Sequence, residues 1–120
     1  SDLPMAAVRK IGKEIKDFAE EPVPGLSWGP KGENLMELEA MVEGPAGSPY
    51  EGGWFKLNIN VDPKYPMKPP QVKFETRCYH CNINDSGEIC LDVLKDQWSA
   101  KISITQLLMC IINLLNDPNP

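Results

Sequence analysis

The residues of this chain best suited to covalent chemistry are a cysteine and a nearby amide side chain. Cys90 follows Asn82 by eight residues. Apolar and polar residues alternate around Cys90, and an extended backbone would turn the flanking Ile89 and Leu91 inward. Cys90 and Asp92 would then share the exposed face. Free cysteines are usually buried and unreactive, so an exposed thiol within reach of an amide donor is unusual and marks the place where covalent chemistry is expected. From these residues alone, a nucleophile and a structural cysteine both stay open.

The composition limits the classes of protein to which the chain can belong. It has 120 residues, 42% of them hydrophobic, which predicts one domain over residues 1–120 with its own core. The net charge is -5 and the longest basic run is Arg9-Lys10, so nucleic acid and anionic membranes are poor candidate partners. Because the sequence shows neither a membrane-spanning apolar stretch nor a signal-peptide pattern, its four cysteines predict reduced thiols in the cytoplasm or nucleus.

Periodic apolar residues predict a helix on either side of a sheet. Apolar side chains recur at helical spacing near the start, with charged residues such as Glu14 on the other faces, so a helix is expected from Leu3 to Glu20. A second helix is expected from Ser103 to Asn116, because Ser103 and Gln106 form a capping box ahead of an apolar run. This run is apolar nearly all round, so the helix should be buried on more than one side.

The segment between the helices alternates in the manner of β-strands. The alternation is clearest from Phe55 to Val61, weaker from Leu35 to Val42 and from Val72 to Phe74, and weakest near Ser27-Trp28. The order of helix, four-stranded antiparallel meander and central helix predicts an α+β fold with that central helix packed on the sheet. Tyr65-Pro66, in a tight loop between strands, is expected to have a cis peptide bond.

Several short motifs occur in the order in which they occur in ubiquitin-conjugating enzymes. They extend over essentially the whole chain: Ser48-Pro49-Tyr50-Glu51-Gly52-Gly53, Tyr65-Pro66-Met67-Lys68-Pro69-Pro70, His80-Cys81-Asn82, Gly87-Glu88-Ile89-Cys90-Leu91-Asp92, Trp98-Ser99 and Asp117-Pro118-Asn119-Pro120. The chain therefore resembles the ubiquitin-conjugating enzyme (E2) family, in particular the subset with His-Cys-Asn in place of His-Pro-Asn. The resemblance implies the ubiquitin-conjugating (UBC) fold, which is α+β.

The resemblance implies an enzyme that accepts ubiquitin from an activating enzyme (E1) as a thioester on Cys90. Ubiquitin would then pass to a substrate lysine with the help of a ubiquitin ligase (E3), and no cofactor is implied. Asn82 would donate to the oxyanion formed during lysine attack or would brace its loop. Asp92 would orient the lysine, and His80 would be a structural hydrogen-bonding residue. Two alternatives stay open, namely conjugation of another ubiquitin-like modifier and a non-catalytic ubiquitin-binding variant, which Cys90 argues against.

The resemblance also implies surfaces for partner proteins. The candidate contacts with E1 and E3 are Arg9, Lys10 and Lys13 on the first helix, and Met67 and Ala100 in two loops. For the basic residues the alternative is a solvated helix face. Further helices are implied after Pro120, where this sequence ends. Met109, Ile112 and Leu115 are candidates for the face that those helices would cover, so the 120-residue chain is expected to be less stable than a longer one or to self-associate.

The other cysteines are not expected to be catalytic. The spacing of Cys78, His80 and Cys81 suggests zinc, but residues 78 and 81 of an extended segment would point to opposite sides. The chain also has no second Cys-x-x-Cys motif, so no metal is expected. Cys110 falls within the apolar helix and is expected to be a core residue.

Overall fold

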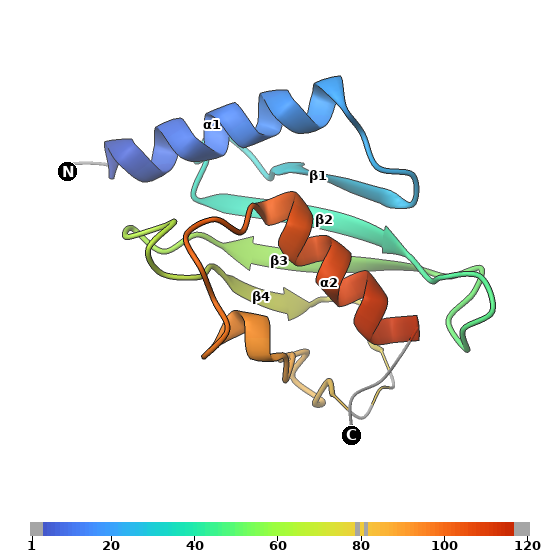
Figure 1. The fold of residues 1–120 in the computed structure, drawn as a ribbon. Coiled ribbons are helices and arrows are strands. Elements are labelled where there is room, and N and C mark those ends of the chain that lie inside the picture. Colours follow the sequence, from blue (N-terminus) through green and yellow to red (C-terminus); the bar gives the residue numbers. More distant parts are fainter. Residues whose placement is uncertain (1–3, 79, 81, 117–120) are drawn as a thin grey trace.

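The order of helices and strands confirms the α+β fold predicted from the sequence. A computed structural model describes residues 4–78, 80 and 82–116 of the chain, with the side chain of residue 92 excepted. The elements follow one another as α1 (Met5–Glu20), β1 (Leu26–Pro30), β2 (Glu37–Glu43), β3 (Trp54–Asn60), β4 (Gln71–Phe74), a short 3-10 helix η1 (Asp92–Leu94) and α2 (Ile104–Asn116). Figure 1 shows these elements as a layer of strands with a layer of helices packed on it.

The sheet is an antiparallel meander in the order β1-β2-β3-β4. Ala40 of β2 lies between its two partners, Trp28 of β1 and Leu57 of β3. Leu57 in turn pairs with Phe74 of β4. Side chains of directly paired residues lie on the same face of a sheet, and all four of these residues are buried. One face of the meander therefore forms one side of the hydrophobic core.

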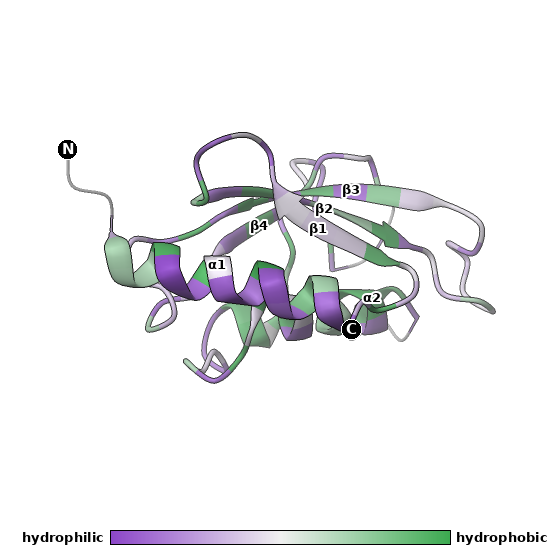
Figure 2. Cartoon of the chain, turned by 90° about the horizontal axis from the view of Figure 1, so that it is seen from above, coloured by the Kyte–Doolittle hydropathy of each residue, from purple (hydrophilic) through white to green (hydrophobic). Residues whose placement is uncertain are grey.

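Both helices cover this apolar face of the sheet (Figures 1 and 2). From α1, Ala7 and Ile11 are 0% exposed. From α2, six residues are buried, namely Ile104, Leu107, Leu108, Ile111, Leu114 and Leu115. The apolar area that these side chains remove from water is the main favourable contribution to packing of the two layers.

The start of α2 confirms the predicted capping box. Ser103 Oγ accepts a hydrogen bond from the Gln106 N–H at 3.1 Å, and Gln106 Oε1 accepts one from the Ser103 N–H at 3.0 Å. Of the three residues expected on the uncovered face, Met109 is 43% exposed and Ile112 is partly buried. Leu115 is 0% exposed, so its assignment to that face is wrong: it continues the inward row that recurs every three or four residues.

Individual residues depart from the sequence-based expectations at several points. The strand bounds differ from those predicted by one or two residues, and α1 begins at Met5, while Leu3 lies outside the described residues. Cys110 is partly exposed rather than in the core, because it lies on α2 beside the inward row of buried residues rather than within it. Glu14 is 7% exposed, although its charge had placed it on the solvated side of α1. The cis bond at Tyr65-Pro66 is confirmed.

Candidate active site

The segment that carries Cys90 folds back on itself beside β4. Ile83 bridges with Ile89, and Glu88 bridges with Lys73 of β4. These are isolated bridges rather than a continuous ladder, so few backbone contacts fix the segment to the sheet. Ile83 and Ile89 are 8% and 7% exposed and anchor it in the core.

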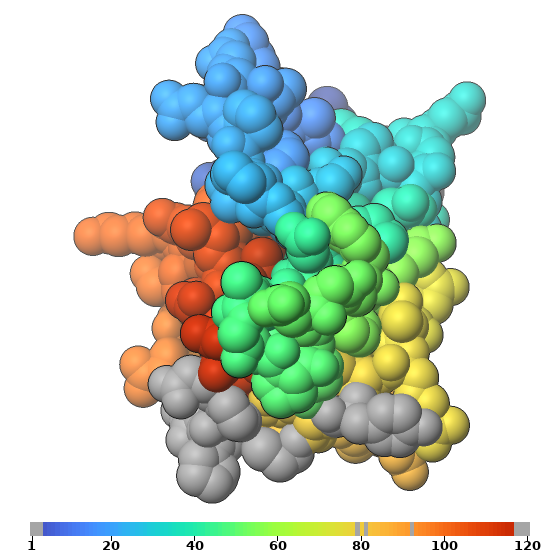
Figure 3. Space-filling model, turned by 90° about the vertical axis from the view of Figure 1, so that its right-hand side faces the viewer, coloured from blue at the N-terminus to red at the C-terminus, as the bar shows by residue number. Residues whose placement is uncertain are grey.

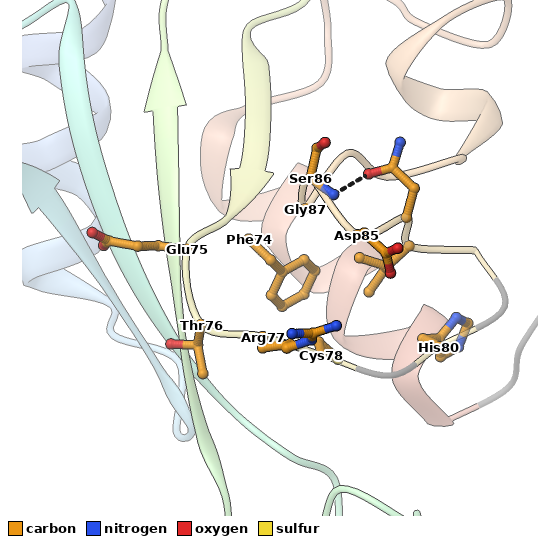
Figure 4. A pocket seen from close by; sticks show the side chains of 11 residues that line it. Phe74, Glu75, Thr76, Arg77, Cys78, His80, Asp85, Ser86 and Gly87 are labelled. Atoms are coloured by element: carbon orange, nitrogen blue, oxygen red, sulfur yellow. Dashed lines mark hydrogen bonds between the residues drawn. The ribbon is translucent and has the colours of Figure 1, made fainter.

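A turn from Asn84 to Glu88 reverses the chain ahead of the cysteine. Asn84 Oδ1 accepts hydrogen bonds from the N–H groups of Ser86 at 2.9 Å (Figure 4, dashed line) and Glu88 at 3.0 Å. Gly87 has a φ of 81°, and a Cβ at this position would overlap the carbonyl oxygen of Phe74. Its own carbonyl accepts from the Phe74 N–H at 2.9 Å. The turn therefore needs glycine here, both for its backbone angle and for its close approach to β4.

Cys90 is exposed, in agreement with the alternation of its neighbours, and Ile89 is buried. The Cys90 N–H donates to the carbonyl oxygen of Asn82 at 2.7 Å, which holds the two residues side by side. Both line an open groove of about 310 Å³, together with Glu88 and Lys95 among others. The structure thus brings the thiol and the predicted amide donor into one groove. Whether the Asn82 amide stabilises an oxyanion or braces the loop stays a prediction.

The imidazole of His80 is engaged at both ring nitrogens. Nδ1 accepts a hydrogen bond from the Asn82 N–H at 2.9 Å, so the ring proton is on Nε2, which donates to the Leu114 carbonyl oxygen at 2.9 Å. The rings of Tyr50 and His80 have centroids 5.9 Å apart. Figure 3 shows the segment around residues 44–53 (green) against the end of α2 (red). The two hydrogen bonds of His80 fit a residue that braces the loop better than a proton acceptor, because neither ring nitrogen has a free lone pair directed at the groove.

The backbone changes direction just after Cys90. Leu91 is partly buried and η1 begins at Asp92. The alternation therefore stops at Leu91, and it cannot be used to place Asp92 on the same face as Cys90. The carboxylate of Asp92 lies outside the described side chains, so its role in orienting lysine remains a prediction that rests on the resemblance.

Lys95 is a groove residue that the sequence analysis did not single out. It is exposed, and η1 brings its segment back toward the thiol. An ammonium group at the rim attracts anionic groups that enter the groove. The only signal for Lys95 in the sequence is its place among the charged residues that follow Cys90, and this signal becomes informative only with the turn at η1.

A second hollow, of about 340 Å³, shares Asn84 with the groove of Cys90 and is also lined by Arg77, Cys78 and Ser86 (Figure 4). Cys78 is 7% exposed, and burial raises the pKa of its thiol. A buried, protonated thiol is a poor nucleophile. Cys81, the other cysteine considered for zinc, lies outside the described residues. Within the described part of the chain, no three His, Cys, Asp or Glu side chains are grouped so as to hold a metal ion.

The residues predicted to contact partner proteins differ in exposure. They are Arg9, Lys10, Lys13, Met67 and Ala100. Arg9 and Lys13 are exposed on α1, and Met67 is 75% exposed. Lys10 is less free, because its Nζ lies 3.4 Å from Glu14 Oε2. Ala100 is partly buried. Their roles in partner binding stay predictions.

The helix-meander-helix fold and the exposed cysteine in a groove define a small α+β protein with an accessible nucleophile. A family model described as "Ubiquitin-conjugating enzyme" matches residues 10–120. The chain therefore belongs to the ubiquitin-conjugating enzyme family, and the resemblance inferred from the motifs is confirmed.

Of the helices that the structure describes, none has the length and apolar character needed to cross a membrane.

Proposed function

We propose that this protein accepts ubiquitin from an activating enzyme as a thioester on Cys90 and transfers it to substrate lysines with a ubiquitin ligase. The observation that carries the proposal is the exposed Cys90 in one groove with Asn82, in a chain of this family. A surface thiol is accessible to a protein-sized donor, which a buried thiol such as Cys78 is not.

In the first step, Cys90 Sγ attacks the carbonyl carbon of the thioester that joins ubiquitin to the activating enzyme. A bond forms from Sγ to this carbon, the bond to the donor sulfur breaks, and the thiol proton passes to the departing sulfur or to solvent. One thioester replaces another, so the step is nearly isoenergetic and needs position more than strong activation. Thiolate is intrinsically very nucleophilic even when it is a minor species.

In the second step, a lysine amine attacks the thioester on Cys90. The carbon–nitrogen bond forms, the carbon–sulfur bond breaks, Cys90 departs as thiolate and the amine loses a proton. Negative charge develops on the carbonyl oxygen, where the Asn82 amide is proposed to donate a hydrogen bond. Asp92 is proposed to orient the incoming amine. His80 supports this step indirectly, since its ring accepts from the Asn82 N–H.

Four classes of partner follow from this function: ubiquitin, the activating enzyme, ubiquitin ligases and protein substrates. The basic residues Arg9, Lys10 and Lys13 of α1 are proposed contacts for the activating enzyme and ligases, and Met67 and Ala100 for ligases. Neither nucleic acid nor membrane is a proposed partner. The proposed location is the cytoplasm, the nucleus or both.

The test is a charging assay with ubiquitin, activating enzyme and ATP, read on a non-reducing gel. We expect an adduct that thiol reductants remove. Cys90→Ser should give a reductant-stable oxyester or no adduct, and Cys90→Ala should give none. Cys110→Ala is the matched control, because this second, partly exposed thiol should be dispensable. A normal thioester on the Cys90→Ala variant would overturn the proposal.

The same assay separates the two alternatives. An adduct with another ubiquitin-like modifier and its activating enzyme, but not with ubiquitin, would identify a different modifier. Binding of ubiquitin without any thiol-sensitive adduct would identify a non-catalytic variant. In both cases the fold and the groove would be unchanged, so the assay must compare modifiers on the same folded preparation.

A further inference from the structure

Glu14 is a buried carboxylate that the proposed chemistry does not use. Among the side chains that the structure describes, Glu14 is the charged residue that is buried, with 7% exposure. It follows Ile11 by three residues, so the same helical spacing that buries Ile11 turns Glu14 toward the core. A buried carboxylate needs donors for its oxygens, and those donors show what it connects.

The donors to Glu14 come from two segments far away in the sequence and from its own helix. The Ile104 N–H, at the start of α2, donates to Oε1 at 2.6 Å. The Tyr65 hydroxyl donates to Oε2 at 2.6 Å, and Lys10 Nζ lies 3.4 Å from the same oxygen. Hydrogen bonds to an ionised acceptor are about twice as strong as neutral ones. One carboxylate therefore links α1 to α2 and to the loop after β3.

This link continues from Tyr65 to a second loop. The rings of Tyr65 and Trp98 have centroids 6.0 Å apart, and Trp98 Nε1 donates to the Pro66 carbonyl oxygen at 2.9 Å. Met67 follows Pro66 directly, and Ala100 lies two residues after Trp98. Met67 and Ala100 are the two loop residues proposed to contact ligases. Each thus lies within two residues of Tyr65 or Trp98, the side chains that these contacts connect to Glu14.

We infer that Glu14 is a positioning residue, which holds the loops at 62–68 and 95–102 in one arrangement against α1 and so sets the geometry of the ligase-docking surface. The inference about docking rests on the proposed function, whereas the inference about the loops does not. Glu14 touches none of the reacting groups, so its effect would be confined to the docking surface and to the start of α2.

Substitutions at Glu14 test whether its hydrogen bonds, rather than its size or its charge, connect α1 to the loops. Glu14→Ala removes the acceptor for both Ile104 and Tyr65. Glu14→Gln keeps an amide oxygen for the Ile104 N–H, and its NH₂ group can donate to the Tyr65 hydroxyl, which can also accept. Gln should therefore retain most of the link that Ala loses. Val42→Ala is the control for general destabilisation. It leaves a cavity in the sheet at a 0% exposed residue that is remote from both loops in the sequence.

The first measurement is amide hydrogen exchange on the whole chain. The Met67 N–H donates to the Lys64 carbonyl at 2.8 Å and the Ile102 N–H to the Ser99 carbonyl at 3.0 Å, so each reports on one loop. In Glu14→Ala we expect both amides to exchange about 10-fold faster, beyond any change shared with Val42→Ala. Near-normal exchange is expected in Glu14→Gln. Equal behaviour of Glu14→Ala and Val42→Ala would overturn the inference.

The second measurement is lysine discharge from the charged variants with a purified ligase domain that stimulates the unmodified protein. In Glu14→Ala the ligase concentration for half-maximal stimulation should rise about 10-fold, as expected for loss of about 1.4 kcal/mol of docking free energy. Unstimulated discharge should be unchanged, which general destabilisation would not produce. An unchanged half-maximal concentration would overturn the docking role. Failure of the unmodified protein to accept ubiquitin would refute the proposed function, while hydrogen exchange would still decide whether Glu14 holds the loops.

Discussion

His80 Nε2 donates to the carbonyl oxygen of Leu114, 34 residues further along the chain, at 2.9 Å. Leu114 is in the last turn of α2, where carbonyl groups have no partner within the helix. The contact therefore gives this carbonyl a partner outside the helix and at the same time attaches the Cys90 segment to the helix layer. Since Nδ1 of the same ring accepts from the Asn82 N–H, one side chain connects the end of α2 to the groove.

Replacing His80 should cost stability and position together. In His80→Ala both the Asn82 N–H and the Leu114 carbonyl lose a partner, and leaving such part-buried groups unsatisfied costs about 1–3 kcal/mol. We expect a lower free energy of unfolding in urea. We also expect slower charging, because the residues of the groove would be less well positioned. His80→Gln can restore at most one bond and should fall between. Full stability with abolished charging would instead mean that His80 takes part in the chemistry.

The role of Asn82 can be separated from that of its neighbour Asn84. If the Asn82 amide donates to the oxyanion, Asn82→Ala should slow discharge to free lysine by roughly 10²- to 10³-fold, the cost of one oxyanion donor in other enzymes. Charging should stay near normal. Asn84→Ala is the matched control, because that side chain lines the same groove but closes the turn to Glu88. Equal loss of both steps in Asn82→Ala would show that its loop had collapsed.

Two glycines should respond to alanine in opposite directions. Gly87→Ala must adopt a φ of 81° and places a Cβ against the Phe74 carbonyl, so it should destabilise the protein by at least about 1–3 kcal/mol. Gly12 lies inside α1, and an added Cβ there would meet nothing within 4 Å. Gly12→Ala should therefore stabilise by about 0.5–1 kcal/mol, since alanine favours the helix. Thermal melting of both variants beside the unmodified protein tests the contrast.

Stability should fall at alkaline pH through Tyr65. Its burial, followed by its hydrogen bond to Glu14, raises the pKa of Tyr65 well above its ordinary value of about 10. The unfolded chain then loses this proton first, so the stabilisation is complete below about pH 10 and is lost above it, by about 1.4 kcal/mol per pH unit. Tyr65→Phe should be less stable at neutral pH but should show a shallower decline. Urea unfolding from pH 8 to 11 gives both slopes, and identical slopes would contradict this assignment.

Much of the fold could be predicted because periodicity records which way a side chain faces. The alternation from Phe55 to Val61 predicts β3 within one residue, and the Ser103–Gln106 capping box predicts the start of α2. The exposure of Cys90 follows from the same local rule. These features depend on neighbours in the sequence, which is why the sequence alone was sufficient.

What could not be predicted depends on residues that meet only in the folded chain. Glu14 shares the helical spacing of Ile11, but the donors that allow its carboxylate to be buried come from 51 and 90 positions away. The place of Lys95 in the groove requires the turn at η1, which interrupts the alternation after Cys90. No period in the sequence encodes such contacts.

The separation between Glu14 and Ile104 has a consequence for how the chain is made. The two residues are 90 positions apart, and at about 5–20 residues per second a ribosome needs roughly 5–20 s to add the second after the first. During that interval α1 can form, but its inward carboxylate lacks the amide donor that allows its burial. Its neighbours Ala7 and Ile11, which are 0% exposed in the folded chain, then lack the part of the core that α2 contributes. Completion of the core in the nascent protein is therefore timed by the emergence of α2.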